Sequence, residues 1–179
     1  MERCHQPARA AACVPILKNT MHHIFIASDH AGFELKNILR DFLVAQGHTV
    51  EDCGPATLDP GDDYPDYVLP CAQKVAQTKD SFGIVVGLSG QGEAIAANRV
   101  KGVRAAVYYG FVDEVLTLSR QHNNANILSL GAKFVTPEAA GQAVQLWLAT
   151  NFAGDERHVR RAAKLDAPVH NLGSDTSVI

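Results

Sequence analysis

One glycine-rich segment has the residue types needed for acid–base chemistry on an anionic substrate. The residues from Gly87 to Glu93 read GLSGQGE and lie between an apolar run and a helical pattern. Glycines let backbone N–H groups turn toward a ligand, and a helix N-terminus behind them favours negative charge, so the segment predicts an anion hole. The Glu93 carboxylate beside it could act as a general base. The alternatives are a tight turn that only packs and a carboxylate that only balances the helix dipole.

Two further polar pairs follow or precede apolar runs. Asp29 and His30 come directly after the first apolar run, so Asp29 could bind sugar hydroxyls and His30 a phosphate or a ring oxygen. A plain N-cap and its neighbour would look the same. His122 and Asn123 end a predicted helix, where a histidine often serves only as a partner of the helix dipole.

Basic residues on a late amphipathic helix could bind phosphate. Arg157 and Arg161 are four residues apart, so two guanidinium groups can face one phosphate. A solvated basic face is the alternative. The formal net charge is −3, which gives no general reason to expect a nucleic acid or an anionic membrane as partner.

Other common sites are not indicated. The glycine-rich loop is neither a phosphate-binding Walker A loop nor a GxGxxG dinucleotide motif, and no HExxH or similar spacing of metal ligands occurs. We therefore assign no metal. Four cysteines lack CxxC spacing and are typical of reduced thiols in an intracellular protein: Cys4, Cys13, Cys53 and Cys71.

Strand-like and helix-like segments alternate along the chain. Apolar runs predict strands at 23–28, 48–53, 82–87, 103–108 and 126–130. Helical spacing predicts helices at 33–46, 67–78, 92–99, 111–121, 137–151 and 155–165. Thr136 is the expected N-cap of the fifth helix, and Pro137 its first residue.

This alternation predicts the α/β class, with a five-stranded parallel sheet covered by helices on both faces in a three-layer, doubly wound, flavodoxin- or Rossmann-like fold. Ligands of such sheets bind beyond the carboxyl ends of the strands. That edge receives Asp29 and His30, Ser89 to Glu93, Tyr109 and Gly110, and Lys133.

The 179 residues suggest one domain, at 21–166. We expect 1–20 to be a disordered extension, because Pro15 and Lys18 interrupt its short apolar stretch, and 167–179 to be a polar tail. No stretch approaches the length of a membrane span.

Five segments together resemble the ribose-5-phosphate isomerase B family, which also contains the galactose-6-phosphate isomerase subunits. They occur in family order and spacing: SDHAGFELK (28–36), DYP (63–65), GLSGQGEAIAANRVKGVRAA (87–106), SRQHNNANILSLGAK (119–133) and ERHVRR (156–161). The resemblance implies a cytoplasmic aldose–ketose isomerase of sugar phosphates that works through a cis-enediolate. It also implies no cofactor, and a homodimer or tetramer with sites at the subunit interface.

The resemblance also implies roles for particular residues. Ser89 and the amides of Gly90, Gln91 and Gly92 would hold the enediolate. His122 would assist ring opening and Asn123 would orient the substrate. The remaining contacts would be Asp29 and His30 with the sugar and phosphate, and Arg157 and Arg161 with the phosphate, from the partner subunit.

Two positions depart from the family pattern. Many members use a cysteine base at the end of the third strand, where this chain has Gly87, so it resembles the subgroup whose base is a glutamate, here Glu93. The phosphate-site residue after the fifth strand is usually arginine, and here it is Lys133, which keeps the charge but loses bidentate geometry. We expect ribose 5-phosphate as the substrate, with tetrose, allose or galactose 6-phosphate as alternatives.

Two functions of other classes stay open. One is a non-catalytic subunit that binds phosphosugars, although a pure binder has no need of a base. The other is a flavodoxin-like nucleotide binder, which predicts flavin absorbance in the purified protein.

Overall fold

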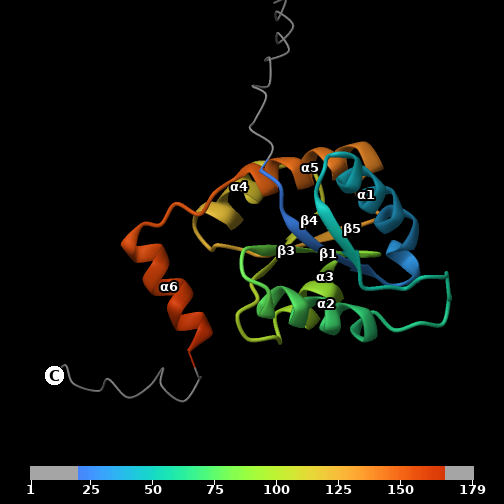
Figure 1. Ribbon diagram of the computed structural model, residues 1–179, viewed down its shortest axis with the longest axis horizontal. Coiled ribbons are helices and arrows are strands. Elements are labelled where there is room, and N and C mark those ends of the chain that lie inside the picture. The colour runs from blue at the N-terminus through green and yellow to red at the C-terminus, as the bar shows by residue number, and fades with distance from the viewer. Residues whose placement is uncertain (1–19, 168–179) are drawn as a thin grey trace, which may run out of the picture.

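The computed structural model describes residues 20–167 and contains one five-stranded parallel sheet (Figure 1). The strands are β1 (His23–Ser28), β2 (Thr49–Asp52), β3 (Ser81–Gly87), β4 (Ala105–Tyr108) and β5 (Ile127–Gly131). The helices are η1 (His30–Gly32), α1 (Phe33–Ala45), α2 (Pro65–Gln77), α3 (Gln91–Ala97), α4 (Glu114–Gln121), α5 (Pro137–Ala149) and α6 (Glu156–Asp166).

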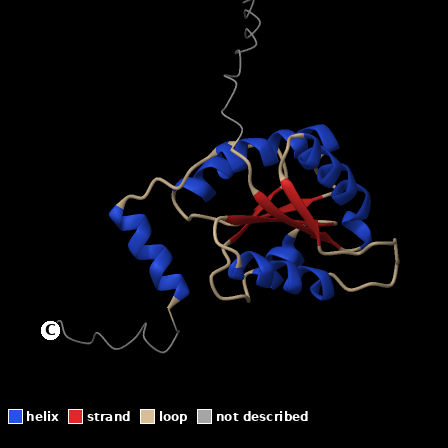
Figure 2. Ribbon diagram, viewed as in Figure 1, coloured by secondary structure: helices blue, strands red, loops and turns tan. Residues whose placement is uncertain are grey.

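The sheet has the order β2-β1-β3-β5-β4, and all neighbouring strands are parallel. Figure 2 shows helices above and below it, which confirms the predicted three-layer α/β class. The order matches the 2-1-3-4-5 order of flavodoxin except that the last two strands are exchanged. The short strand β4 therefore forms an edge.

Alternate residues of the central strands pack into two separate cores. Ile24 and Ile26 of β1 belong to the core beneath α1, α4 and α5, whereas Phe25 and Ala27 belong to the core against α2 and α3. Because both faces are covered, the strands read as continuous apolar runs rather than as an alternating pattern.

The predicted cap of the fifth helix agrees with the structure, whereas several other predicted boundaries differ from it. The Thr136 cap is confirmed, since its side chain accepts a hydrogen bond from the Ala139 N–H at 3.2 Å. The fourth helix begins at Glu114 instead of 111, because Phe111 has φ +72°, a left-handed conformation outside a helix. The fourth strand begins at Ala105 instead of 103, because the Val103 N–H donates a hydrogen bond to Val100 O in a turn.

A buried lysine ties α1 to the segment after β2. Lys36 has no exposed surface, and its Nζ donates to Asp52 Oδ2 at 2.6 Å and to Pro55 O at 3.2 Å. Asp52 is partly buried, which opposes ionisation, but its bonds to Lys36 and to the Gly54 N–H lower its pKa overall. This contact fixes the start of the loop 53–64.

The last helix, α6, packs only lightly on its own chain. His158 is its one buried residue, and Arg104 pairs with Asp166 at 3.2 Å. In Figure 1, α6 lies at the side of the sheet opposite to the loop between β2 and α2. Within residues 20–167, no helix is long and apolar enough to cross a membrane. The predicted extension 1–20 and tail 167–179 lie, except for their innermost residues, outside the described part of the chain.

Candidate active site

The carboxyl ends of β1, β3 and β5 bring several predicted site residues together. The parallel register pairs Ser28 with Val86 and Gly87 with Gly131, so the segments that follow these strands share one edge of the sheet. The Lys133 N–H donates to Leu88 O at 3.1 Å. Asp29, His30, the glycine-rich loop and Lys133 therefore lie at the same end of the molecule, as predicted.

The glycine-rich loop has a defined conformation before α3. Gly90 has φ +73°, which favours glycine, and its carbonyl accepts a hydrogen bond from the buried Ser129 Oγ at 2.6 Å. Ser89 Oγ accepts from the Gln91 N–H at 3.3 Å. The turn is thus held from inside the sheet, which keeps the amides around it in place.

Glu93 is a buried carboxylate in the first turn of α3, and only 4% of it is exposed. Burial raises its pKa, a hydrogen bond from its own backbone N–H opposes that shift, and the charge of Asp29 adds to it. A base with a raised pKa takes up a proton more readily at neutral pH than an exposed glutamate does.

The carboxylate of Glu93 occupies the space that a side chain on Gly87 would need. A Cβ built on Gly87 would overlap Oε1, Cδ and Oε2 of Glu93, far inside contact distance. Gly87 ends β3 and is itself buried. Glycine at this position is therefore a requirement for the observed placement of Glu93.

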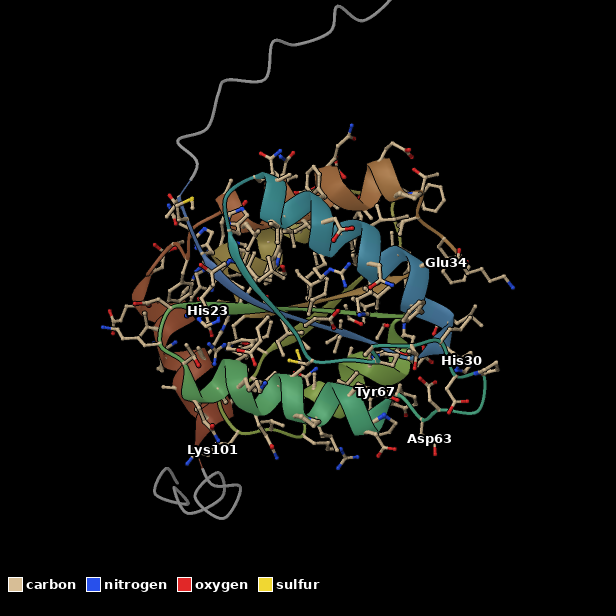
Figure 3. All side chains as sticks on the ribbon, turned by 45° about the vertical axis from the view of Figure 1, so that its right-hand side comes forward. His23, His30, Glu34, Asp63, Tyr67 and Lys101 are labelled. Carbon is tan, nitrogen blue, oxygen red and sulfur yellow. The ribbon has the colours of Figure 1, made fainter. Side chains whose placement is uncertain are left out.

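Asp29 and His30 have different surroundings. Asp29 is buried and its Oδ1 accepts from the Gly32 N–H at 3.1 Å, so the N-cap interpretation is confirmed for this residue. His30 is exposed, and its Nδ1 lies 2.7 Å from Asp62 Oδ1. Figure 3 shows His30, Asp63 and Tyr67 at one side of the molecule, with His23 and Lys101 at the other.

The loop between β2 and α2 supplies residues for which the sequence suggested no role. Asp62 contacts His30, and the ring of Tyr64 lies over Gly92, where an added Cβ would come within 2.9 Å of Tyr64 Cζ. The sequence DDYP at 62–65 has the composition of an ordinary turn and does not by itself predict these contacts. Two signals pointed to this loop: its position after the carboxyl end of a parallel strand, and the DYP segment at 63–65, to which the sequence assigned no role.

A second group of predicted residues lies at the opposite end of the sheet. His122 follows α4 and precedes β5, whose five residues, Ile127–Gly131, span roughly 13 Å. Its ring stacks on that of His158 in α6, with centroids 4.4 Å apart and planes 9° apart. Asn123, Arg157 and Arg161 are exposed at this end. One chain therefore does not bring this group to Glu93.

Comparison with known proteins gives consistent results. The family model described as ribose/galactose isomerase matches residues 24–165. The probable ribose-5-phosphate isomerase B of Mycoplasma pneumoniae is 42% identical over 146 residues, covering 82% of this chain and 94% of the relative. The ribose-5-phosphate isomerase B of Mycolicibacterium paratuberculosis is 40% identical over 138 residues, covering 77% and 86%.

Solved structures are similar over the same region. Ribose-5-phosphate isomerase B from Mycoplasma genitalium, solved with bound ribulose 5-phosphate, superimposes with a TM-score of 0.77 and 41% identity, covering 82% of this chain and 96% of the other. The ribose 5-phosphate isomerase from Thermotoga maritima gives 0.75 and 41%, covering 81% and 97%.

Proposed function

The chain belongs to the ribose/galactose isomerase family, and on that premise we propose that it interconverts ribose 5-phosphate and ribulose 5-phosphate with Glu93 as the base. It is a sugar-phosphate aldose–ketose isomerase. The observation that carries the assignment of the base is the buried Glu93 carboxylate, which fills the place of a side chain on Gly87. Relatives with a cysteine base would carry their reactive sulfur at that place.

The proposed reaction moves one proton between neighbouring carbons. Glu93 removes the proton from C2 of the open-chain aldose, and the electrons of that bond form the C1–C2 double bond of a cis-enediolate. Ser89 and the amides of Gly90 to Gly92 stabilise its oxygen, a role worth about 10²–10³ in rate per donor. Glu93 then returns the proton to C1 while the C2 hydroxyl proton passes to the C1 oxygen, which leaves the ketose.

A second copy of the chain would complete the site. The length of β5, roughly 13 Å, separates His122 and Asn123 from the end of the sheet that carries the glycine-rich loop. Arg157 and Arg161 lie on α6, whose His158 stacks on His122. In our proposal they serve the partner's Glu93, with His122 opening the sugar ring and the two arginines binding phosphate. Asp29, His30 and Lys133 bind the substrate from the chain that carries Glu93.

Surface features support a dimer. The helix α6 has eleven residues, buries only His158 and exposes Val159 and Leu165, and an isolated helix of that length is marginal in water. A groove of about 390 Å³ beside the edge strand is lined by Gln91, Ala94, Ile95, Asn98, Arg99, Ala105 and Val107. The edge strand and the exposed Ile95 are surfaces that a partner chain would cover.

Glu93→Gln is the direct test of the base. Turnover of ribose 5-phosphate should fall at least about 10³-fold, and deuterium from D₂O should no longer enter C1 of the ketose. Glu138→Gln, in the first turn of α5 and exposed, is the matched control and should leave both unchanged. Activity of Glu93→Gln within tenfold of wild type would exclude Glu93 as the base.

Mixing two inactive variants tests the shared site. Glu93→Gln and the double variant Arg157→Ala/Arg161→Ala should each be nearly inactive. After joint refolding, about half of the dimers are mixed, and each mixed dimer has one intact site, so about a quarter of the wild-type activity should return. A mixture as inactive as its components would mean that each site is built from one chain.

A substrate panel tests the sugar. The kcat/KM for ribose 5-phosphate should exceed that for four-carbon and six-carbon aldose phosphates. Lys133→Arg should improve phosphate binding with every sugar alike, because it restores a bidentate donor without changing the length of the pocket. A higher kcat/KM for a tetrose or hexose phosphate would transfer the assignment to that sugar.

A further inference from the structure

The Asp62 side chain contacts both the backbone N–H and the ring of His30. Asp62 Oδ1 accepts a hydrogen bond from the His30 N–H at 3.0 Å and lies 2.7 Å from His30 Nδ1. The Asp62 side chain is 4% exposed, whereas that of His30 is 40% exposed. A buried carboxylate thus holds the inner edge of a ring whose outer edge faces solvent.

The loop that carries Asp62 is fixed at several points. Lys36 binds Pro55 O at its start, and the Asp62 N–H donates to Asp59 O at 3.2 Å. The ring of Tyr64 lies against Gly92 at its end. Asp62 therefore meets His30, which is 32 residues away in sequence, from a rigid support.

This contact determines what the outer nitrogen of His30 can do. An ionised carboxylate only accepts hydrogen bonds, so Nδ1 carries the proton and Nε2 is the nitrogen left for a ligand. In the neutral ring Nε2 is an acceptor, and in the imidazolium it is a donor. Phosphate oxygens accept, so only the imidazolium can bind them through Nε2.

The charges around His30 favour the imidazolium. The hydrogen bond to Asp62 raises the pKa of His30. Desolvation opposes this, but the charges of Asp29 and Asp62 add to the hydrogen bond, and the pKa is raised overall. Tyr67 lies near Asp62, and its own pKa is raised by burial and by the neighbouring carboxylates, so it stays neutral beside them.

We propose that Asp62 is a positioning residue that keeps His30 in the imidazolium form, with Nε2–H directed to the substrate phosphate, and so extends phosphate binding to higher pH. The proposal rests on the proposed function, in which His30 binds the substrate. Asp62 itself touches His30 and acts through it. A loop anchor without this role would change stability but not the pH dependence of binding.

Asp62→Asn separates the two roles. The amide keeps the shape and an acceptor oxygen but removes the charge. We expect KM for ribose 5-phosphate, and Ki for inorganic phosphate as a competitive inhibitor, to rise about three- to tenfold at pH 7.5, with kcat within about twofold of wild type. The rise of KM with pH should begin at lower pH, and NMR titration of His30 should show its pKa lowered in the variant.

Asp59→Asn is the matched control, because Asp59 lies in the same loop and is exposed. Its Oδ1 accepts a hydrogen bond from the Gly61 N–H at 2.9 Å, and an asparagine can form the same turn. This variant should leave KM, Ki, kcat, the pH dependence of KM and the titration of His30 unchanged. An Asp62→Asn enzyme with the wild-type KM profile, or with an unshifted His30, would overturn the proposal.

Failure of the proposed function has a different signature. The NMR titration of His30 and the binding of inorganic phosphate, followed by calorimetry, need no turnover. If the wild-type chain did not isomerise ribose 5-phosphate, the effect of Asp62→Asn on these two measurements would still decide the role of Asp62.

Discussion

The carboxylate of Glu93 fills the volume that a side chain on Gly87 would need. An added Cβ at position 87 would overlap three atoms of Glu93. The two positions therefore cannot both carry side chains in this conformation, and a base can come from one of them at a time.

Gly87→Ala should displace the catalytic carboxylate. The added methyl group forces Glu93 away by an ångström or more, and a misplacement of that size typically costs about 10²-fold in rate. Steady-state kinetics should show this fall in kcat with little change in KM.

Gly141→Ala is the control for that substitution. Gly141 lies in α5, and its added Cβ would meet the Phe42 ring at 3.5 Å, an ordinary contact. Alanine is favoured over glycine inside a helix by about 0.5–1 kcal/mol, so activity should persist and stability should not fall. A kcat of Gly87→Ala within threefold of wild type would show that Glu93 can act from another position.

The acid limb of the pH–rate profile should report Glu93. Its pKa is raised above 4.5, chiefly by burial, so kcat/KM should fall about tenfold per pH unit below that raised value. Asp29→Asn should move the limb to lower pH, because the charge of Asp29 also raises the pKa of Glu93. Titration of the substrate phosphate is the same for both enzymes and cancels in their ratio. A limb unmoved by Asp29→Asn would contradict the coupling of the two carboxylates.

Glu93 should reduce stability at neutral pH. Its folded pKa lies above its unfolded value, so the native state binds the proton more tightly and becomes less stable as pH rises from 4.5 through the folded pKa. Glu93→Gln removes this cost. Calorimetry should show a higher Tm for the variant at pH 7, by about 2–4 °C for each kcal/mol recovered, and the gain should disappear below pH 4.5. A gain of equal size at both pH values would point to packing instead.

The stack of His122 on His158 predicts a defect that depends on the sugar. His158→Ala removes the support of the His122 ring, so ring opening should slow and kcat/KM for ribose 5-phosphate should fall about tenfold. Erythrose 4-phosphate cannot close a furanose ring, because its C4 oxygen carries the phosphate, and should be affected much less. His158→Phe keeps a stacking ring and should recover most of the loss. Equal losses for both sugars would mean that His158 acts through the phosphate arginines of α6.

Local sequence patterns were sufficient for the central strands and failed where distant residues decide the conformation. The apolar run of β1 predicts both ends of the strand, His23 and Ser28, correctly. A strand buried on both faces is continuously apolar, so its ends show in the sequence. Phe111 lies at helical spacing with Val115 and Leu118, yet Phe111 is 93% exposed and left-handed. No local pattern distinguishes such a surface from a buried helix face.

The site shows the same division. The positions of Glu93 and His30 follow from the rule that ligands bind beyond the carboxyl ends of parallel strands. The partner of His30 does not, because Asp62 is 32 positions away in a loop whose composition is that of an ordinary turn. The position of His122 at the other end of the sheet is set by where β5 begins, and its role depends on a second chain.

The buried Lys36 has a consequence for how this sequence can diverge. Its ammonium group meets no water and is balanced by Asp52, so loss of the carboxylate alone would leave a cation without its counter-charge in the interior. Loss of the lysine alone would free the segment at Pro55 that leads to Asp62 and Tyr64. Positions 36 and 52 should therefore be inherited as a pair, and descendants that replace one should replace the other in the same lineage.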